Sequence, residues 1–315
     1  MPRHVLMGDS RQCFGGSMMN FFSMMPARLG ETAESASRLP RRRFLQAAGA
    51  LAALGAAGFD YRTTGSLFAA DPNAADTSHQ AQQEAIRAIP LNKLNEEAQR
   101  KVLSVLERPS IYRRLPTKSV DCDPDMFVFM VRNPEVVVNI WEIMGISQMV
   151  AERVGPYAWK GNDGQGTESN VELVYGTDEA HLFYGEGFYE GPLLKRKVSG
   201  RCVMLLRSGY GLGQDMRALV SNRLDVFIAI DNVGAELIAK TLQPLVGSTA
   251  DTNFTEAAKF LSKLSQTAEE NPDGMHRLAG KLNRCDQTVK QGFATVSSSV
   301  NQRVAQRLAG NMQRR

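Results

Sequence analysis

The stretch Ser169–Tyr189, SNVELVYGTDEAHLFYGEGFY, indicates the fold class of this 315-residue chain. Apolar or aromatic side chains occupy every second position in each half of it: Val171, Leu173 and Tyr175, then Leu182 and Tyr184. The segment Gly176–Asp178 separates the two halves and supplies residues typical of a tight turn. This pattern predicts two antiparallel strands with one face buried, and the second strand carries apolar side chains on both faces.

Comparable segments on either side extend the predicted sheet. The segments rich in aromatic or β-branched residues are Gln148–Lys160, Ser169–Tyr175, Ala180–Tyr189, Arg196–Arg207 and Arg217–Ile230. Turn residues cluster between them at Gly161–Gly164, Gly176–Asp178 and Ser208–Gly211. We therefore expect a meander of about five antiparallel strands.

Helical patterns precede the sheet. Leu91–Leu106 carries apolar residues at spacings of three and four, which predicts an amphipathic helix. Between Asp123 and Met144 an N-cap residue is twice followed by proline, at Asp123-Pro124 and Asn133-Pro134, so two short helices are expected there. Ser110–Lys118 is basic and is expected to be irregular.

Helical patterns also follow the sheet. They cover Val233–Leu245, Phe254–Thr267 (capped by Thr252 or Asn253) and the long stretch Met275–Leu308. Helices, then strands, then helices indicate an α+β fold. This order resembles the helix-grip, START-like folds, in which a curved sheet wraps a long helix around an apolar cavity, and also the NTF2-like folds. We expect a targeting segment over 1–70, a linker over 71–90, an α+β domain over 91–250 and a helical region over 251–315.

An export signal is predicted ahead of this domain. Pro40–Gln46 has the sequence PRRRFLQ, which resembles the signal of the twin-arginine (Tat) pathway. In that resemblance Arg41 and Arg42 are the paired arginines, and Phe44 and Leu45 are the apolar step. Gln46 and Pro40 depart from the usual residues, but the pair itself is intact. The resemblance implies that the Tat translocase is a partner and that the folded protein acts in the periplasm or elsewhere outside the cytoplasm.

The apolar segment Phe44–Phe59 follows the arginines. Rich in Ala and Gly, it would span roughly 24 Å as a helix, which is short for a bilayer core of about 30 Å. This suits the apolar part of a signal better than a permanent span, or than a buried helix of a cytosolic domain. Ala69 and Ala70 are candidate cleavage positions without a clean motif, so membrane contact is expected only through an uncleaved signal.

Charge is unevenly distributed. The chain has a net charge of +4, and residues 1–70 carry all of that excess, which leaves 71–315 neutral. A neutral domain has no bulk electrostatic attraction to nucleic acid, so no nucleic-acid partner is expected. Cys122, Cys202 and Cys285 are widely spaced after the signal, and we expect them to be buried thiols.

Aromatic residues and one carboxylate are the candidates for a ligand pocket. The residues proposed to line it are Trp141, Trp159, Tyr184, Glu186 and Phe188. The alternative for the aromatic members is that they only fill the core. If the strand is regular, His181 and Glu186 point to opposite faces and are not partners.

Other motifs have structural explanations. The acids Asp121, Asp123 and Asp125 could bind a cation, but a helix N-cap explains them better. The segment Asn162–Gly166 could bind phosphate or metal, but a hairpin turn is the simpler interpretation. The sequence carries no hydrolase, zinc-protease or dinucleotide motif, and it identifies no cofactor, catalytic residue or metal ligand.

Three functions stay open at this stage. The first is a non-catalytic extracytoplasmic domain that binds a lipid-like or other apolar ligand. The second is an interaction module of the cell envelope that uses the helical stretch Met275–Leu308. The third is a carboxylate-based enzyme that uses Glu186, which requires a cleft around that residue.

Overall fold

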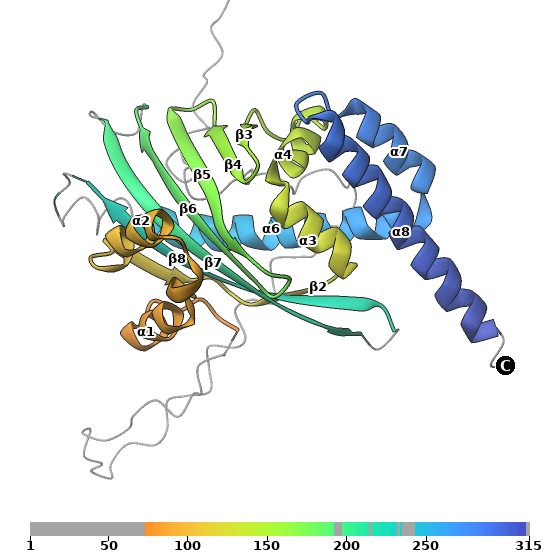
Figure 1. Ribbon diagram of the computed structural model, residues 1–315, viewed down its shortest axis with the longest axis horizontal. Helices are drawn as coiled ribbons and strands as arrows, with labels where there is room; N and C mark the ends of the chain where they lie inside the picture. Colours follow the sequence, from red (N-terminus) through yellow and green to blue (C-terminus); the bar gives the residue numbers. More distant parts are fainter. Residues whose placement is uncertain (1–72, 192–196, 214–215, 232–233, 235–242, 313–315) are drawn as a thin grey trace, which may run out of the picture. The chain divides into compact units, whose positions relative to one another are not determined.

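One antiparallel sheet forms the centre of the computed structural model (Figure 1), which describes residues 73–191, 197–213, 216–231, 234 and 243–312. In these residues the strands are β1 Ile111–Arg114, β2 Lys118–Asp121, β3 Val150–Gly155, β4 Ala158–Asn162, β5 Thr167–Gly176, β6 Ala180–Tyr189, β7 Val198–Leu212 and β8 Ala218–Ile230. Their order across the sheet is β1-β8-β7-β6-β5-β4-β3, and β2 also pairs with β8.

Helices lie before, within and after the strands. They are α1 His79–Ala88, a 3-10 turn Leu91–Lys93, α2 Glu96–Leu106, α3 Pro124–Arg132, α4 Pro134–Ile143, α6 Gln243–Glu270, α7 Pro272–Lys281 and α8 Gln287–Met312. The α+β class predicted from the sequence is therefore confirmed. None of the described helices combines the length and apolar character needed to cross a membrane.

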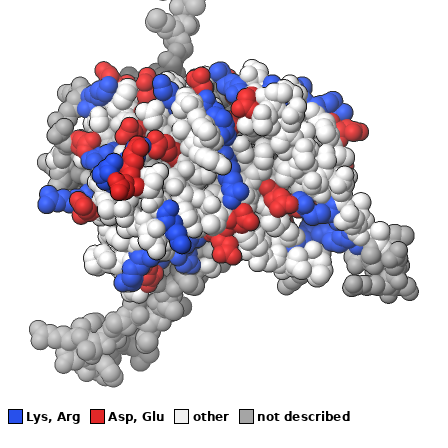
Figure 2. All heavy atoms as spheres, viewed as in Figure 1, with Lys and Arg blue, Asp and Glu red and all other residues white. Residues whose placement is uncertain are grey.

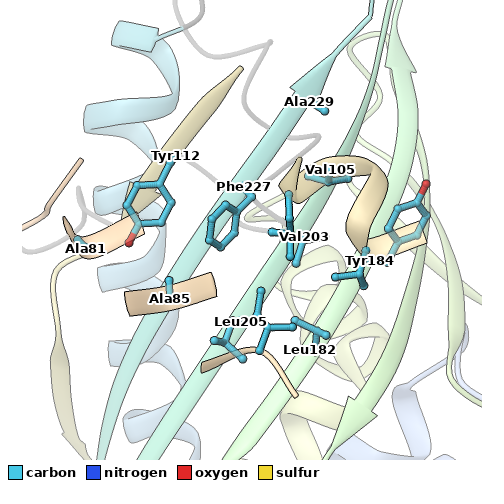
Figure 3. Close-up of a cluster of buried hydrophobic side chains, with 13 residues drawn as sticks. Ala81, Ala85, Val105, Tyr112, Leu182, Tyr184, Val203, Leu205, Phe227 and Ala229 are labelled. Carbon is cyan, nitrogen blue, oxygen red and sulfur yellow. The ribbon is translucent and has the colours of Figure 1, made fainter. Parts of the chain in front are cut away.

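The sheet is covered on both faces, as Figure 1 shows for α1 and α2 in front of the strands and α6 behind them. We call the face of the sheet toward α1 and α2 the α1 face. Its core includes Leu182, Tyr184, Val203, Leu205 and Phe227 (Figure 3). The opposite face, here the α6 face, packs Cys202, Leu206, Val220 and Ile228 against Phe127 of α3 and Phe254 of α6. Helices from before and after the strands thus cover the two faces of one antiparallel sheet.

The strand count exceeds the predicted five for two reasons. Ser110–Lys118, expected to be irregular, contains β1 and begins β2, because Arg114 is paired with the buried Asp225 and can therefore lie in a covered strand. The single segment predicted over Gln148–Lys160 is a hairpin of β3 and β4. The expected turn Ser208–Gly211 lies inside β7 instead, paired with β8.

Helix starts were predicted best where a cap residue precedes a proline. Asp123 accepts hydrogen bonds from the amides of Asp125 and Met126 at the start of α3, as expected. The expected cap at Thr252 or Asn253 is wrong, since both lie inside the continuous helix α6. The stretch Met275–Leu308 is interrupted between α7 and α8, where the Asp286 carboxylate caps α8 through the amide of Val289.

Several predicted segments lie outside the described residues. They are the targeting segment 1–70 with Arg41, Arg42, Phe44 and Leu45, and most of the helix expected over 233–245. The predicted boundary at 250/251 falls within α6, which packs on the sheet. The segment 71–90, expected to be a linker, contains α1, because Ala81 and Ala85 pack into the core.

Candidate functional site

A groove lies where the edge strands extend beyond the cover of α1 and α2. It has a volume of about 380 Å³ and spans β3 to β6. Its lining residues are Val150, Glu152, Lys160, Gly161, Asn162, Glu168, Ser169, Asn170, Gly187 and Phe188. The groove thus has a floor of rigid, hydrogen-bonded strands.

Strand register places the polar side chains of the groove in two parallel rows. In the first row, Lys160 is paired with Glu152 on one side and Asn170 on the other, and Glu186 continues the row on β6. In the second row the paired residues are Val150, Asn162, Glu168 and Phe188. Side chains two positions apart share one face of a strand, so both rows point to the same side of the sheet.

The polar side chains of the groove are exposed and have few partners. Within the described part of the chain, Glu152, Lys160, Glu168 and Asn170 make no hydrogen bond or ion pair. Elsewhere charged side chains are commonly paired, as in the contacts of Arg113 with Asp251 and of other arginines with acids. The groove is therefore a concentration of hydrogen-bonding groups that the fold itself does not use.

Phe188 and Glu186 end the rows on β6. The Lys197 ammonium lies 3.4 Å from the centre of the Phe188 ring, a cation–π contact at the rim of the groove. Glu186 is exposed and accepts a hydrogen bond of 3.1 Å from the Tyr184 hydroxyl. Burial, reinforced by the Glu186 carboxylate, raises the pKa of Tyr184, so this hydroxyl stays protonated and donates.

The structure separates the five residues proposed for a pocket. Phe188 lines the groove, and Glu186 and Tyr184 lie beside it on the same face. Trp159 lies on the α6 face, fully buried, and Trp141 of α4 is 1% exposed in a separate cluster. The two tryptophans are core residues here, which is the alternative considered for them above.

A buried carboxylate, Glu135, explains the position of Trp159. It accepts hydrogen bonds from Trp159 Nε1 at 2.6 Å and from Arg153 Nε at 2.7 Å, and the Arg153 guanidinium lies over the indole ring. Glu135 is 1% exposed, so its carboxylate is not accessible to a solute. Its role is to join α4 to the edge hairpin of β3 and β4.

A second buried cluster lies under α1. Asp225 is fully buried and accepts hydrogen bonds from Tyr112, Arg114 and Arg207. Burial and the Asp225 carboxylate raise the pKa of the Tyr112 hydroxyl. The cluster has the residue types of an active site, but its carboxylate is fully buried, and Arg114 links it to α1 through Glu84 and the Ala81 carbonyl oxygen.

His181 is buried on the opposite face from Glu186, so the two are not partners, as expected. Arg132 Nε donates to His181 Nε2 at 3.3 Å, and Nδ1 has no hydrogen-bond partner among the described residues. Burial, together with the nearby Arg132 charge, lowers the pKa of His181 to about 4. This histidine is therefore neutral at physiological pH.

The candidate metal and thiol sites have structural roles. Asp123 caps α3 and binds Arg303, and no group of acids, histidines or cysteines in the described residues could hold a metal ion. Asn162 and Asp163 accept from the amides of the β4–β5 turn, where Gly164 has a φ of 70°. The described cysteines are free and buried, and burial raises the pKa of the Cys202 thiol to about 12.

Sequence reasoning missed most of the groove. Glu152, Lys160, Glu168 and Asn170 were not proposed as site residues, and Asn162 was considered only as part of the turn Asn162–Gly166. A signal was present in β5, where polar residues occupy alternate positions at Glu168, Asn170 and Glu172. That alternation marks an exposed face, but only the register shows that three further strands place polar groups beside it.

Comparison with known proteins adds a fold-level likeness only. No family model and no curated protein matches this chain. The chain is similar to the solved structure of a conserved protein from Geobacillus kaustophilus, with 9% identity and a TM-score of 0.30 over 45% of this chain and 93% of the other.

Two further solved structures give comparable values. For the hypothetical protein jhp0584 from Helicobacter pylori the identity is 12% and the TM-score 0.31, over 47% of this chain and 86% of the other. For the di-domain ARO/CYC BexL of the BE-7585A biosynthetic pathway the identity is 15% and the TM-score 0.24, over 66% of this chain and 59% of the other. At such scores the function has to be argued from the residues of the site.

Proposed function

We propose that this protein is an exported, non-catalytic binding domain that holds a hydroxyl-rich ligand, a carbohydrate, in the groove over β3–β6. The observation that carries the proposal is the set of exposed polar side chains that line the groove without partners: Glu152, Lys160, Glu168 and Asn170. Export by the Tat pathway rests on Arg41 and Arg42 and is part of the same proposal.

The chemistry of the lining favours hydroxyl groups over other ligands. Two carboxylates accept hydrogen bonds, Lys160 donates them, and the amides of Asn162 and Asn170 do both. A hydroxyl also donates and accepts, so a polyol can satisfy all of these groups at once. An apolar ligand, as expected from the sequence, would leave them without partners and desolvated, which is unfavourable.

The dimensions of the groove suit a short chain of sugar rings. Neighbouring strands lie about 4.8 Å apart, so the path from β3 to β6 is roughly 14 Å long. The two rows run along this path and end at Phe188 on β6; the Lys197 ammonium covers one face of this ring, so a sugar ring would pack against the other face or the ring edge. Sites of this kind combine an aromatic surface with a few polar groups that fix orientation.

Binding of trisaccharides to the purified protein tests the proposal. Cellotriose, chitotriose and maltotriose serve as probes in titration calorimetry, with spermidine and palmitate as probes of a cationic and an apolar ligand. We expect at least one trisaccharide to bind, and the change Asn170→Ala to weaken its binding about tenfold, since a lost hydrogen bond is worth about 1.4 kcal/mol.

A matched control lies on the exposed surface of α2. Glu96 and Arg100 are 95% and 72% exposed in their side chains, and Glu96→Ala or Arg100→Ala should leave binding unchanged. Binding of palmitate alone, or trisaccharide binding that is insensitive to Asn170→Ala and Lys160→Ala, would contradict the proposal.

A further inference from the structure

Four side chains at the β5–β6 end of the groove form a compact square. Asn170 lies directly opposite Glu186 in the strand register. Two positions away on the same strands, Glu168 lies directly opposite Phe188. Glu168 and Glu186 are therefore diagonal neighbours on one face of the sheet, with their Cβ atoms about 7–8 Å apart. A glutamate side chain is long enough for both carboxylates to reach one small group between them. We call these four residues the β5–β6 subsite.

Neither carboxylate of the subsite has a cationic partner among the described residues. Glu168 makes no hydrogen bond or ion pair there, and Glu186 accepts one hydrogen bond, of 3.1 Å, from the Tyr184 hydroxyl. Lys160 is the one cation among the described lining residues of the groove. It lies directly opposite Glu152 on β3 and only diagonal to Glu168. The negative charge of the subsite is therefore available to a ligand.

The cations on the neighbouring strand have acids of their own. Arg201 of β7 lies beside the subsite, but its guanidinium binds Asp231 at 2.9 Å. The Lys197 ammonium lies 3.9 Å from the Glu190 carboxylate and 3.4 Å from the centre of the Phe188 ring. The last contact is an example, within the chain itself, of an ammonium held at the rim of this subsite.

The charge of the wider surface does not favour cations in general. Figure 2 shows acidic and basic side chains interspersed over the face that carries α1 and α2. Residues 71–315 are also neutral as a whole. Exposed charges that lie further apart than about 8 Å are largely screened at physiological ionic strength. A cationic group is therefore selected at short range, by the carboxylates that it touches.

We propose that the β5–β6 subsite binds a protonated amino group, so that the carbohydrate held in the groove is an amino sugar with a free amine. This inference rests on the carbohydrate-binding function proposed above. An ammonium has three N–H donors and no acceptor, which matches the carboxylates of Glu168 and Glu186 and the side-chain oxygen of Asn170. Such charge-assisted hydrogen bonds are stronger than those that a hydroxyl would make to the same groups.

The same residues suit an ammonium better than a metal ion. Calcium takes about six to eight oxygen ligands, more than two carboxylates and one amide supply. Phe188 offers no oxygen at all, whereas the free face or edge of its ring can pack against the sugar ring that carries the amine.

Three trisaccharides with one β-1,4-linked backbone test the inference, because they differ only at C2. The glucosamine trimer has a free amine there, chitotriose an acetylated amine and cellotriose a hydroxyl. Titration calorimetry uses the full-length protein at a pH at which the free amine is protonated. We expect the glucosamine trimer to bind about tenfold more tightly than either of the others. Added salt should reduce this preference, since it depends on charge.

The substitution Glu168→Gln assigns the preference to the subsite. Glutamine keeps the length of the side chain but removes its charge, so the affinity for the glucosamine trimer should fall about tenfold more than the affinity for cellotriose. Glu96→Gln is the matched control, because the Glu96 side chain is 95% exposed on α2. It should leave all three affinities unchanged.

The outcomes separate this inference from the function on which it rests. Equal affinities for the glucosamine trimer and cellotriose, or a preference that Glu168→Gln does not reduce, would overturn the inference and leave the carbohydrate proposal standing. Failure of all three trisaccharides to bind would contradict the proposed function itself. Spermidine binding as tightly as the glucosamine trimer would overturn both, because the groove would then recognise amines without a sugar.

Discussion

His181 shows how a single residue makes stability depend on pH. It is fully buried between β6 and α3, and its pKa is lowered to about 4 by burial and by Arg132. In the unfolded chain the same imidazole titrates near 6.5. Between these two values the unfolded state binds a proton that the native state does not, so the free energy of unfolding falls as pH is lowered.

We therefore predict that a His181→Gln variant depends less on pH than the natural protein. Glutamine can still accept the hydrogen bond from Arg132, but it does not titrate. Between pH 6.5 and 4 the natural protein should lose about 2 kcal/mol more of its free energy of unfolding than the variant does. Urea unfolding at several pH values measures this. If the free energies of unfolding of the two proteins changed in parallel with pH, His181 would be protonated equally in the native and unfolded states, and the prediction would be wrong.

At the scale of the element, two adjacent arginines of strand β1 connect it to two different helices. In β1, Arg114 points to the α1 face and contacts Asp225, Glu84 and the Ala81 carbonyl oxygen. The preceding Arg113 points to the α6 face and binds Asp251 of α6. Because side chains alternate between the two faces of a strand, one arginine binds α1 on one face of the sheet and the next binds α6 on the other.

We therefore predict that the substitution Arg114→Ala destabilises α1 without destabilising α6. Arg114→Ala leaves the fully buried Asp225 with one arginine fewer, and it removes the link to Ala81 and Glu84. Amide hydrogen exchange in α1 should accelerate about 100-fold, because removing one partner of a buried ion pair costs about 3 kcal/mol. Mass spectrometry of exchanged peptides resolves the helix.

Arg113→Ala is the matched control, since it changes the same residue type one position away. It should leave the exchange of α1 unchanged and accelerate that of the first half of α6. Equal acceleration of α1 in both variants would mean that the strand unfolds as a whole and that Arg114 is no specific anchor.

At the scale of the whole molecule, the predicted signal and the described domain occupy separate parts of the sequence. The predicted signal residues Arg41 and Arg42 lie outside the described residues, whereas the described domain holds its own core on both faces of the sheet. Export should therefore depend on the arginine pair without any effect on the folded domain.

We predict that the paired change Arg41→Lys with Arg42→Lys blocks export in a bacterial host with a working Tat translocase. Arg43→Lys, at the variable position of the signal, is the control and should be exported normally. Fractionation followed by immunoblotting measures the exported share, and normal export of the paired variant would exclude the Tat assignment. Equal urea midpoints of all three proteins would show that the domain itself is unchanged.

Patterns with a local physical cause were the ones that sequence alone could determine. The alternation in Ser169–Tyr189 predicted two strands because side chains of a strand alternate between faces whatever lies around them. The caps at Asp123 and the turn at Asn162–Gly164 were likewise predictable, because their hydrogen bonds join residues only a few positions apart. Local signals of this kind established the α+β class.

Long-range pairing decided what the sequence could not. β1 became a strand because Arg114 meets Asp225, which is 111 positions away. The two tryptophans proposed for a pocket became core residues because Glu135 and Phe260 pack against them. Only the register of four strands assembles the groove, since no pattern within one strand records which residues lie beside it on the next.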